Sequence, residues 1–277
     1  MNITVFPTQL SGRVTVPPSK SVAHRMVIAA ALSEGTSTIT NIYPSEDILA
    51  TMSCMRKLGA EIDFTGDRAE ITGIKDIPET AELDCGESGS TLRFLIPVAC
   101  ALGVKTTFQG RGRLPQRPIT PYLDEFPKHG ISFEYDNTMP FSVNGKLTGG
   151  KFYVDGGISS QFITGLLFSL PLLKEDSEIV LTSHLESKPY VDITLGTLRD
   201  HGCKIEETEN GYFVKGGQHY EPFSGKVEGD YSQAAFFKVA NSLGSRIEIA
   251  GLEEKSFQGD KKIVEICEKI VYNVFTS

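Results

Sequence analysis

The chain has 277 residues, of which 40% are hydrophobic and 22% are charged. This composition is typical of a globular protein with room for about two domains. The net charge of -8 is opposite in sign to the basic surface of a general nucleic-acid-binding protein. No apolar stretch reaches the ~18 residues of a membrane span, and residues 1–16 lack the apolar core of a secretory signal peptide.

The cysteines indicate a reducing compartment. There are five of them, an odd number, and none forms a Cys-x-x-Cys pair. This pattern favours a cytoplasmic protein over a disulfide-linked one, and it predicts no zinc site. The histidines are also dispersed, so we expect no bound metal. The cysteines are Cys54, Cys85, Cys100, Cys203 and Cys267.

The first predicted elements are two helices. A Ser/Lys-rich turn after a short apolar strand, Val14-Thr-Val, predicts a helix from Ser21 to Ser33. A second helix is expected from Ser45 to Leu58, because its apolar residues recur at helical spacing. Gly59 follows it and suits the left-handed position just past a helix end.

The chain then repeats this pattern. Gly59, Gly130 and Gly202 are 71 and 72 residues apart, and each is followed by two short alternating strands. A second set of segments starts at Leu83 and recurs in phase with the first. Repeats of this length indicate stacked structural units. The predicted unit is a strand, a Gly/Ser turn, a helix, a strand, a helix and a β-hairpin, with the Val14 strand as a looser first member.

A fourth unit begins but breaks off. Residues 259–270 have the amphipathic pattern of its second helix, yet no glycine and hairpin follow before Ser277. Two interpretations stay open: a divergent capping end, as repeat proteins often have, and a truncated chain. The regularity of the earlier units favours truncation.

The Gly/Ser turns are candidate anion sites. A helix N-terminus carries unpaired N–H groups and a partial positive charge, and small residues let an oxyanion approach. Serine is also a common helix cap, so the turns alone are weak signals. Cations beside them strengthen the hypothesis: Lys20 and Arg25 flank one turn, Arg93 follows another, and residues 110–118 contain three arginines. This pattern predicts a substrate with more than one anionic group.

Several other site types are not supported. The chain has no GxxxxGK[ST] loop, no GxGxxG turn after its first strand and no GxSxG elbow. His24 lies between Lys20 and Arg25, where a capping or packing role is favoured over that of a catalytic base.

Six motifs together resemble the 5-enolpyruvylshikimate-3-phosphate (EPSP) synthase family, the 3-phosphoshikimate 1-carboxyvinyltransferases of aromatic amino-acid biosynthesis. The resemblance runs from Met1 to about Ile270, with the motifs in family order. They are Pro-Ser-Lys-Ser-Val-Ala-His-Arg (18–25), Gly-Glu-Ser-Gly-Ser-Thr-Leu-Arg (86–93), Leu-Pro-Gln-Arg-Pro-Ile (114–119), Asp-Gly-Gly-Ile-Ser-Ser-Gln (155–161), Ser-Lys-Pro-Tyr-Val-Asp (187–192) and Glu-Gly-Asp (228–230).

The resemblance implies an inside-out α/β barrel of the enolpyruvyl transferase type, with helices inside and sheets outside in two lobes. Residues 20–229 would form the complete three-repeat lobe, which binds shikimate-3-phosphate. Residues 1–19 and 230–277 would form part of the second lobe.

The resemblance also implies site residues, in two sets that share Lys20, the predicted catalytic residue. The predicted ligands of shikimate-3-phosphate are Lys20, Ser21, Arg25, Ser159, Ser160, Gln161, Ser187 and Tyr190. The predicted ligands of phosphoenolpyruvate are Lys20, Gly89, Arg93, Arg117 and Gln161. Glu87 and Phe94 depart from the commonest family residues beside the phosphoenolpyruvate turn. We expect Lys20→Ala and Arg25→Ala to weaken binding and leave the fold intact.

The implied reaction transfers the enolpyruvyl group of phosphoenolpyruvate to the 5-hydroxyl of shikimate-3-phosphate and releases phosphate, without a cofactor. The resemblance further implies a cytoplasmic enzyme, monomeric at full length, with no nucleic-acid or membrane partner. It places the general base beyond Ser277, so we expect these 277 residues alone to be inactive. The alternative function is therefore a catalytically incomplete fragment that only binds shikimate-3-phosphate. A purely structural repeat protein is disfavoured by the basic turns.

Overall fold

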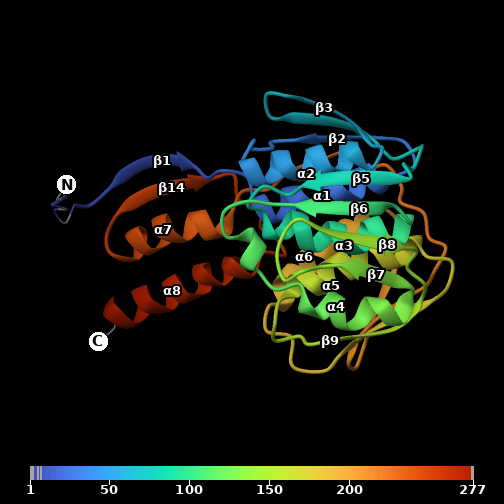
Figure 1. The fold of residues 1–277 in the computed structure, drawn as a ribbon. Helices are drawn as coiled ribbons and strands as arrows, with labels where there is room; N and C mark the ends of the chain where they lie inside the picture. The colour runs from blue at the N-terminus through green and yellow to red at the C-terminus, as the bar shows by residue number, and fades with distance from the viewer. Residues whose placement is uncertain (1–2, 5, 7, 276–277) are drawn as a thin grey trace. The chain divides into compact units, whose positions relative to one another are not determined.

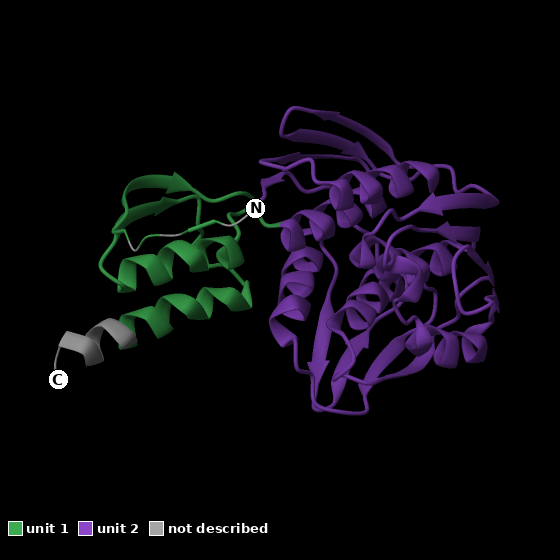
Figure 2. Ribbon diagram, turned by 60° about the vertical axis from the view of Figure 1, so that its left-hand side comes forward, with its two compact units in different colours: residues 1–19, 228–277 green, residues 20–227 purple. Residues whose placement is uncertain are grey.

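The computed structural model describes residues 3–4, 6 and 8–275. The chain divides into two compact units, which Figure 2 distinguishes by colour. Unit 1 comprises Met1–Ser19 and Glu228–Ser277, and unit 2 comprises Lys20–Val227. None of the helices in the described part of the chain is both long enough and apolar enough to cross a membrane.

The first repeat of unit 2 confirms the two helices expected from the sequence, α1 (Lys20–Leu32) and α2 (Glu46–Lys57). Ser45 caps α2, because its Oγ accepts the N–H of Ile48 at 3.4 Å. Acidic residues in the first turn and basic residues in the last turn complement the helix dipole. Gly59 has a φ of +109°, as expected from its place after the helix end.

The other elements of unit 2 follow the predicted order, which Figure 1 shows. In the second repeat, the second helix is the short α4 (Thr120–Glu125). The helices are α3 (Gly89–Leu102), α5 (Ser160–Ser169) and α6 (Lys188–Asp200). The strands are β2 (Thr36–Thr40), β3 (Glu61–Thr65), β4 (Arg68–Thr72), β5 (Thr80–Asp84), β6 (Lys105–Gln109), β7 (Ile131–Glu134), β8 (Phe141–Gly145), β9 (Gly150–Val154), β10 (Ser177–Leu181), β11 (Ile205–Thr208), β12 (Gly211–Val214) and β13 (Gly225–Lys226).

Three four-stranded sheets with one common topology are present among the described residues of unit 2. In the second and third sheets, a strand pairs in parallel with the next one, and an antiparallel hairpin completes the sheet. The orders are β5-β6-β8-β7 and β9-β10-β12-β11. In the first sheet, β13 from the end of unit 2 pairs in parallel with β2.

The first strand of the chain does not join the sheet of the first repeat. The strand β1 (Ser11–Thr15) pairs in parallel with β14 (Arg246–Ala250) of unit 1 over five residues. The sequence pattern places a strand before α1 correctly. Which sheet that strand joins depends on a partner more than 230 positions away, so a local pattern cannot decide it.

The core of unit 2 is made of helices. In α1, α3 and α5, nearly every residue is buried, whereas α2 and α6 are buried on one face only. Helices that are apolar all round must lie inside, with the sheets outside them (Figure 1). This confirms the inside-out α/β arrangement for unit 2.

Unit 1 contains the β1–β14 pair and two helices, α7 (Tyr231–Ser242) and α8 (Lys262–Phe275). Asp230 caps α7 by accepting the N–H groups of Ser232 and Gln233 at 2.8 and 3.3 Å.

Candidate anion-binding site

The turn before α3 leaves two backbone N–H groups without an acceptor in the part of the chain that the structure describes. Gly86 adopts a left-handed conformation with φ of +58°, and its N–H donates to Asp84 Oδ1 at 2.8 Å. Ser88 then caps the helix, because its Oγ accepts the N–H of Thr91 at 3.2 Å. Among the described residues, no group accepts the N–H of Gly89 or Ser90. These two donors lie at the positive end of the helix dipole.

Arg117 lies directly against this turn. A Cβ atom added to Gly89 would lie 2.4 Å from Arg117 Nη1, so only glycine leaves room for the guanidinium there. The preceding 3-10 turn, Leu114–Gln116, anchors the loop through the buried side chain of Leu114. The exposed Arg117 side chain therefore adds a cation beside the two free N–H groups.

Arg111, in the same loop, serves a different purpose. Its guanidinium nitrogens lie 3.4 Å from a Glu46 carboxylate oxygen and 4.0 Å from an Asp84 carboxylate oxygen. Arg111 therefore pairs with surface acids.

Arg93 and Gln161 connect the turn of α3 to the turn of α5. Arg93 Nη1 donates to Gln161 Oε1 at 2.7 Å, and Gln161 Nε2 donates to Ser90 Oγ at 2.9 Å. Arg93 Nη2 donates to the carbonyl of Pro118 at 3.1 Å. Burial, together with the nearby Arg117 cation, lowers the pKa of Arg93. Its buried Nε has no partner among the described residues.

The backbone around Arg93 is supported by an unusual pair of features. Pro97, inside α3, has no N–H to donate to the carbonyl of Arg93. The buried hydroxyl of Tyr122 donates to that carbonyl at 2.7 Å instead. Gly165 of α5 packs on the same place, since a Cβ there would lie 2.4 Å from the Arg93 carbonyl oxygen. Because α3 lacks the backbone hydrogen bond at Pro97 and α5 has no side chain at Gly165, α3 and α5 can approach each other closely.

The turn before α5 has the same capped geometry. Ser159 Oγ accepts the N–H of Gln161 at 3.3 Å. Asp155 Oδ1 accepts the N–H of Gly157 at 2.9 Å and the hydroxyl of Ser183. Hydrogen bonds from Ser183 and Gly157 lower the pKa of Asp155. The turn is thus held in shape by its own acid, and Ser160 begins the helix behind it.

Arg25 is a buried link between three helices. From α1, it donates to Thr194 Oγ1 at 2.8 Å on α6 and to Thr164 Oγ1 at 3.3 Å on α5. It also donates to the carbonyls of Ser21 and Tyr190, at 2.7 and 2.9 Å. The residue is 3% exposed, and burial lowers the pKa of Arg25 to about 9, so it remains a cation at neutral pH. The expectation that Arg25→Ala leaves the fold intact is not compatible with this environment.

Lys20 is, in contrast, half exposed. Its Nζ lies 2.7 Å from Asp47 Oδ2 on α2. Asp47 was not singled out from the sequence, because an acid in the first turn of a helix is typical of a dipole partner. Its role as the ion-pair partner of Lys20 depends on the fold, which brings together two residues that are 27 positions apart.

The start of α6 lacks the cap that the other turns have. Ser187 is the N-cap residue, but its side chain makes no capping hydrogen bond. Tyr190 is 41% exposed one turn later. Pro189 has no N–H at this helix start, and the N–H of Tyr190 donates to the carbonyl of Ser187 at 3.1 Å.

All eleven predicted site residues lie in unit 2, at the caps or within the first two turns of α1, α3, α5 and α6, or in the loop before α4. The hydrogen bonds join Arg93 with Gln161, and Arg25 with Ser21 and Tyr190. No described hydrogen bond joins Lys20 or Arg25 to Ser159, Ser160 or Gln161. Ser90 was missed by sequence reasoning, although it stands one repeat before Gln161.

The two unusual residues beside the α3 turn have different environments. Glu87 is exposed, and its carboxyl group lies over Gly112, where a Cβ would come within 2.2 Å of it. Phe94 is buried, with its ring centroid 5.2 Å from the Arg25 guanidinium and 6.4 Å from the His24 ring. Phe94 is therefore part of the packing that surrounds Arg25.

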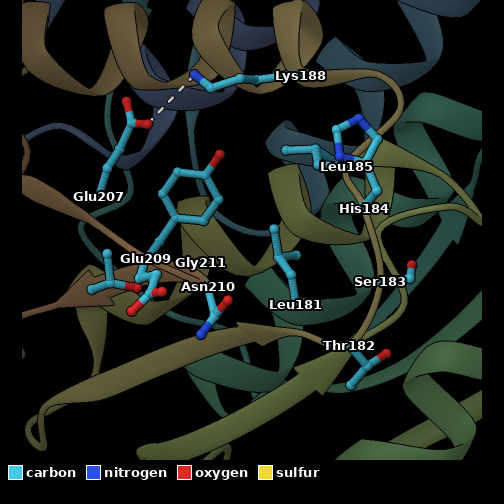
Figure 3. Close-up of a pocket in the computed structure, with 12 residues that line it drawn as sticks. Leu181, Thr182, Ser183, His184, Leu185, Lys188, Glu207, Glu209, Asn210 and Gly211 are labelled. Carbon is cyan, nitrogen blue, oxygen red and sulfur yellow. Dashed lines mark ion pairs between the residues drawn. The ribbon is translucent and has the colours of Figure 1, made fainter.

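A pocket of about 480 Å³ opens between the loop after β10 and the β11–β12 hairpin (Figure 3). Lys188 reaches across it toward Glu207, with the two charged groups 3.4 Å apart. None of the predicted ligand-binding residues lines it, although Ser187 directly precedes Lys188. The pocket borders the turn before α5 through Ser183, whose hydroxyl donates to Asp155 and accepts from the N–H of Gly157.

Comparison with known proteins identifies the family of this chain. The profile of the family described as EPSP synthase (3-phosphoshikimate 1-carboxyvinyltransferase) matches residues 6–276. The chain belongs to the EPSP synthase family. It is 46% identical over 279 residues to the 3-phosphoshikimate 1-carboxyvinyltransferase of Clostridium beijerinckii, and 44% identical over 283 residues to that of Clostridioides difficile. Each match covers 97% of this chain and 64% of the relative, so the chain spans about two thirds or less of the proteins it matches.

Solved structures of the family share the fold. EPSP synthase from Acinetobacter baumannii superposes with a TM-score of 0.80 at 23% identity, covering 94% of this chain and 59% of that one. A second structure of the A. baumannii enzyme gives the same TM-score at 24% identity. Both superpositions confirm the expected α/β fold of the enolpyruvyl transferase type.

Proposed function

We propose that this protein is a 3-phosphoshikimate 1-carboxyvinyltransferase, which transfers the enolpyruvyl group of phosphoenolpyruvate to the 5-hydroxyl of shikimate-3-phosphate and releases phosphate. The family membership supports this reaction. So does one observation in the structure. The two free N–H groups at the start of α3 lie against Arg117, and they are joined through Ser90, Gln161 and Arg93 to the turn of α5.

The α3 turn suits phosphoenolpyruvate. Its donors are the N–H groups of Gly89 and Ser90 and the guanidinium of Arg117, with Arg93 and Gln161 beside them. Phosphate and carboxylate oxygens are preferred acceptors for donors of this kind. We assign these residues, together with Lys20, to phosphoenolpyruvate.

The turns of α5 and α6 suit the phosphate of shikimate-3-phosphate. Ser159 and Ser160 form the small-residue turn of α5, and Ser187 leaves the start of α6 uncapped. We assign the second substrate to Lys20, Ser21, Arg25, Ser159, Ser160, Gln161, Ser187 and Tyr190. Because Arg25 is fully engaged with protein groups, its contribution is to place Ser21 and Tyr190 through their carbonyls.

In the proposed reaction, the 5-hydroxyl oxygen loses its proton and forms a bond to C2 of phosphoenolpyruvate, while C3 gains a proton. The C2–O bond to phosphate then breaks, phosphate leaves, and C3 loses a proton so that the double bond is restored. Negative charge remains on the phosphate and carboxylate oxygens throughout. Lys20, Arg117 and the α3 N–H groups would hold that charge in place, which is the usual way that such sites lower a barrier. Lys20 would exchange its Asp47 partner for substrate oxygens.

We propose that residues 20–229 form the lobe that carries these sites, and residues 1–19 with 230–277 belong to the other lobe. The five cysteines are free thiols in the structure, which supports a cytoplasmic location. We further propose that the full-length protein acts as a monomer on its two small substrates.

Two measurements test the proposal. Calorimetric titration of the 277-residue chain with shikimate-3-phosphate should show binding, and shikimate, which lacks the phosphate, should bind much more weakly. Phosphate release from the two substrates together should be catalysed by the protein at its native length. Equal affinity for shikimate and its phosphate ester would refute the assigned phosphate site. A native-length protein that releases no phosphate would refute the reaction.

A further inference from the structure

A buried chain of four side chains runs from α1 through α2 to the start of α3. His24 Nδ1 lies 2.8 Å from Thr51 Oγ1, which lies 2.7 Å from Thr91 Oγ1. Thr91 Oγ1 in turn lies 2.7 Å from Ser88 Oγ. The four residues are at most 2% exposed. With solvent excluded, each short contact needs a hydrogen supplied by one of its two members.

The direction of these hydrogen bonds follows from counting hydrogens. The Thr91 hydroxyl donates to Ser88 Oγ, which commits its single hydrogen. Thr51 must therefore donate to Thr91, and His24 Nδ1 must donate to Thr51. The carbonyl of Asp47 is also near both threonine hydroxyls, but at 3.2 and 3.4 Å it competes poorly with contacts of 2.7 Å.

The environment of His24 supports the same direction independently. Burial lowers the pKa of His24 to about 3, so the ring is neutral and carries one hydrogen. Its Nε2 is buried and has no partner among the described residues. With the hydrogen on Nδ1, this Nε2 is an unpaired acceptor. The reverse direction would leave a buried N–H without an acceptor, which protein interiors strongly avoid.

Ser88 is the last residue in this row of hydrogen bonds. Its Oγ accepts from both the N–H and the hydroxyl of Thr91, at 3.2 and 2.7 Å, which uses both lone pairs. Its own hydrogen remains, and no group in the described part of the chain accepts it. Ser88 directly precedes Gly89 and Ser90, whose N–H groups are also free, and Arg117 lies against Gly89.

We propose that Ser88 is a further ligand-binding residue, whose hydroxyl donates to one oxygen of the anion held at the start of α3. His24, Thr51 and Thr91 are its positioning residues, because they keep both Ser88 lone pairs occupied and its hydrogen available. The proposal rests on the proposed function in taking phosphoenolpyruvate as that anion. Since Ser88 is 2% exposed, a single ligand oxygen is the most that it can contact.

The direction of the chain can be tested without any ligand. Nitrogen-15 NMR of the 277-residue chain at pH 7 should show His24 with its hydrogen on Nδ1 and a bare Nε2. Thr51→Val removes the acceptor of that hydrogen, so it should shift the ring toward the Nε2–H form. If the wild-type His24 carries its hydrogen on Nε2, the hydrogen bonds cannot run from His24 toward Ser88. That result would overturn the proposal, whatever the protein binds.

The role of Ser88 is tested with phosphoenolpyruvate, titrated into the native-length protein saturated with shikimate-3-phosphate. Ser88→Ala should weaken binding by at least ~10-fold, the value of one charge-assisted hydrogen bond. Ser88→Thr keeps the cap and the donor, so it should restore most of the affinity. Ser45→Ala is the matched control, because it removes the same kind of cap from α2 and should leave the affinity unchanged.

The outcomes separate the two proposals. If Ser88→Ala binds as tightly as the wild type, or if Ser45→Ala weakens binding equally, Ser88 is only a helix cap, and the proposed function still stands. If the wild-type protein itself fails to bind phosphoenolpyruvate, the proposed function falls, and the role of Ser88 falls with it.

Discussion

Ser90 and Gln161 occupy equivalent positions in consecutive repeats, 71 residues apart, and they are hydrogen-bonded to each other, Gln161 Nε2 donating to Ser90 Oγ at 2.9 Å. The repeat thus brings two helix starts together, and a side chain of the later repeat donates to a side chain of the earlier one. Gln161 can do this because its other amide atom accepts from Arg93.

Gln161→Glu keeps the shape of the side chain between Arg93 and Ser90 but adds a negative charge there. The carboxylate would keep the bond from Arg93 and strengthen it, so the thermal stability should stay the same or rise slightly. It would also place a negative charge among the anion donors, so the affinity for phosphoenolpyruvate should fall by at least ~10-fold. Thermal melts and calorimetric titration measure the two effects. A variant that loses stability and keeps its affinity would contradict the assignment.

Gly89→Ala should displace Arg117. The added Cβ would lie 2.4 Å from Nη1, which is too close for the guanidinium to stay. We expect phosphoenolpyruvate affinity to fall by roughly 10- to 100-fold, since one charge-assisted contact is lost. Shikimate-3-phosphate affinity should be unaffected.

A double-mutant cycle with Arg117→Ala provides the control for Gly89→Ala. If both changes act through the same contact, the double variant should be no weaker than Arg117→Ala alone. Fully additive losses would mean that the methyl group added at position 89 acts without moving Arg117.

Lys20 and Arg25 should respond differently to removal. Lys20→Ala breaks an exposed ion pair, so it should change the free energy of unfolding by less than about 1 kcal/mol while weakening substrate binding. Arg25→Ala leaves Thr164, Thr194 and two carbonyls without their donor in a buried site. We expect it to destabilise the protein by at least about 1–3 kcal/mol, the cost of a buried group that loses its hydrogen-bond partner. Urea unfolding of both variants measures this, and equal stabilities would be inconsistent with the helix-linking role of Arg25.

Acid should destabilise the protein through His24. Burial lowers its pKa from 6.5 to about 3, so the unfolded state binds a proton that the folded state does not. The stability is therefore fully present above pH 6.5 and is lost as the pH falls toward about 3. Between pH 6.5 and pH 4, the loss from this residue should be roughly 3 kcal/mol.

His24→Asn cannot titrate in this range, so it should reduce the slope of stability against pH. Denaturant unfolding between pH 7 and pH 4 measures the slope. His184→Asn, at an exposed position, is the matched control and should leave it unchanged. If the two variants have the same slope as the wild type, His24 is protonated in the folded protein.

The sequence allowed the repeating unit to be predicted because each of its signals is local. Ser45, Gly59 and the apolar spacing between them depend only on neighbouring residues, and α2 ends within a residue or two of the expected bounds. The fold could also be predicted from the motifs shared with the EPSP synthase family, and the fold comparisons confirm it.

Long-range relationships could not be predicted in the same way. Arg25 looks like a free ligand-binding cation in the sequence, since its partners Thr164 and Thr194 lie more than 130 residues away. The bond from Tyr122 to the Arg93 carbonyl also depends on α4 packing beside α3. For the same reason, the assigned substrate contacts stay predictions until binding is measured.

The pairing of β13 with β2 has a consequence for the order of folding during synthesis. Asn41, just after β2, donates to the carbonyl of Val227 at 2.6 Å, across 186 residues. The first sheet of unit 2 therefore remains without its edge strand until the ribosome has made nearly the whole unit. The strand β1, translated before β2, waits longer still, because its partner β14 ends at Ala250. The strand β1 is thus among the last of these strands to pair, and its unpaired backbone needs protection while it emerges.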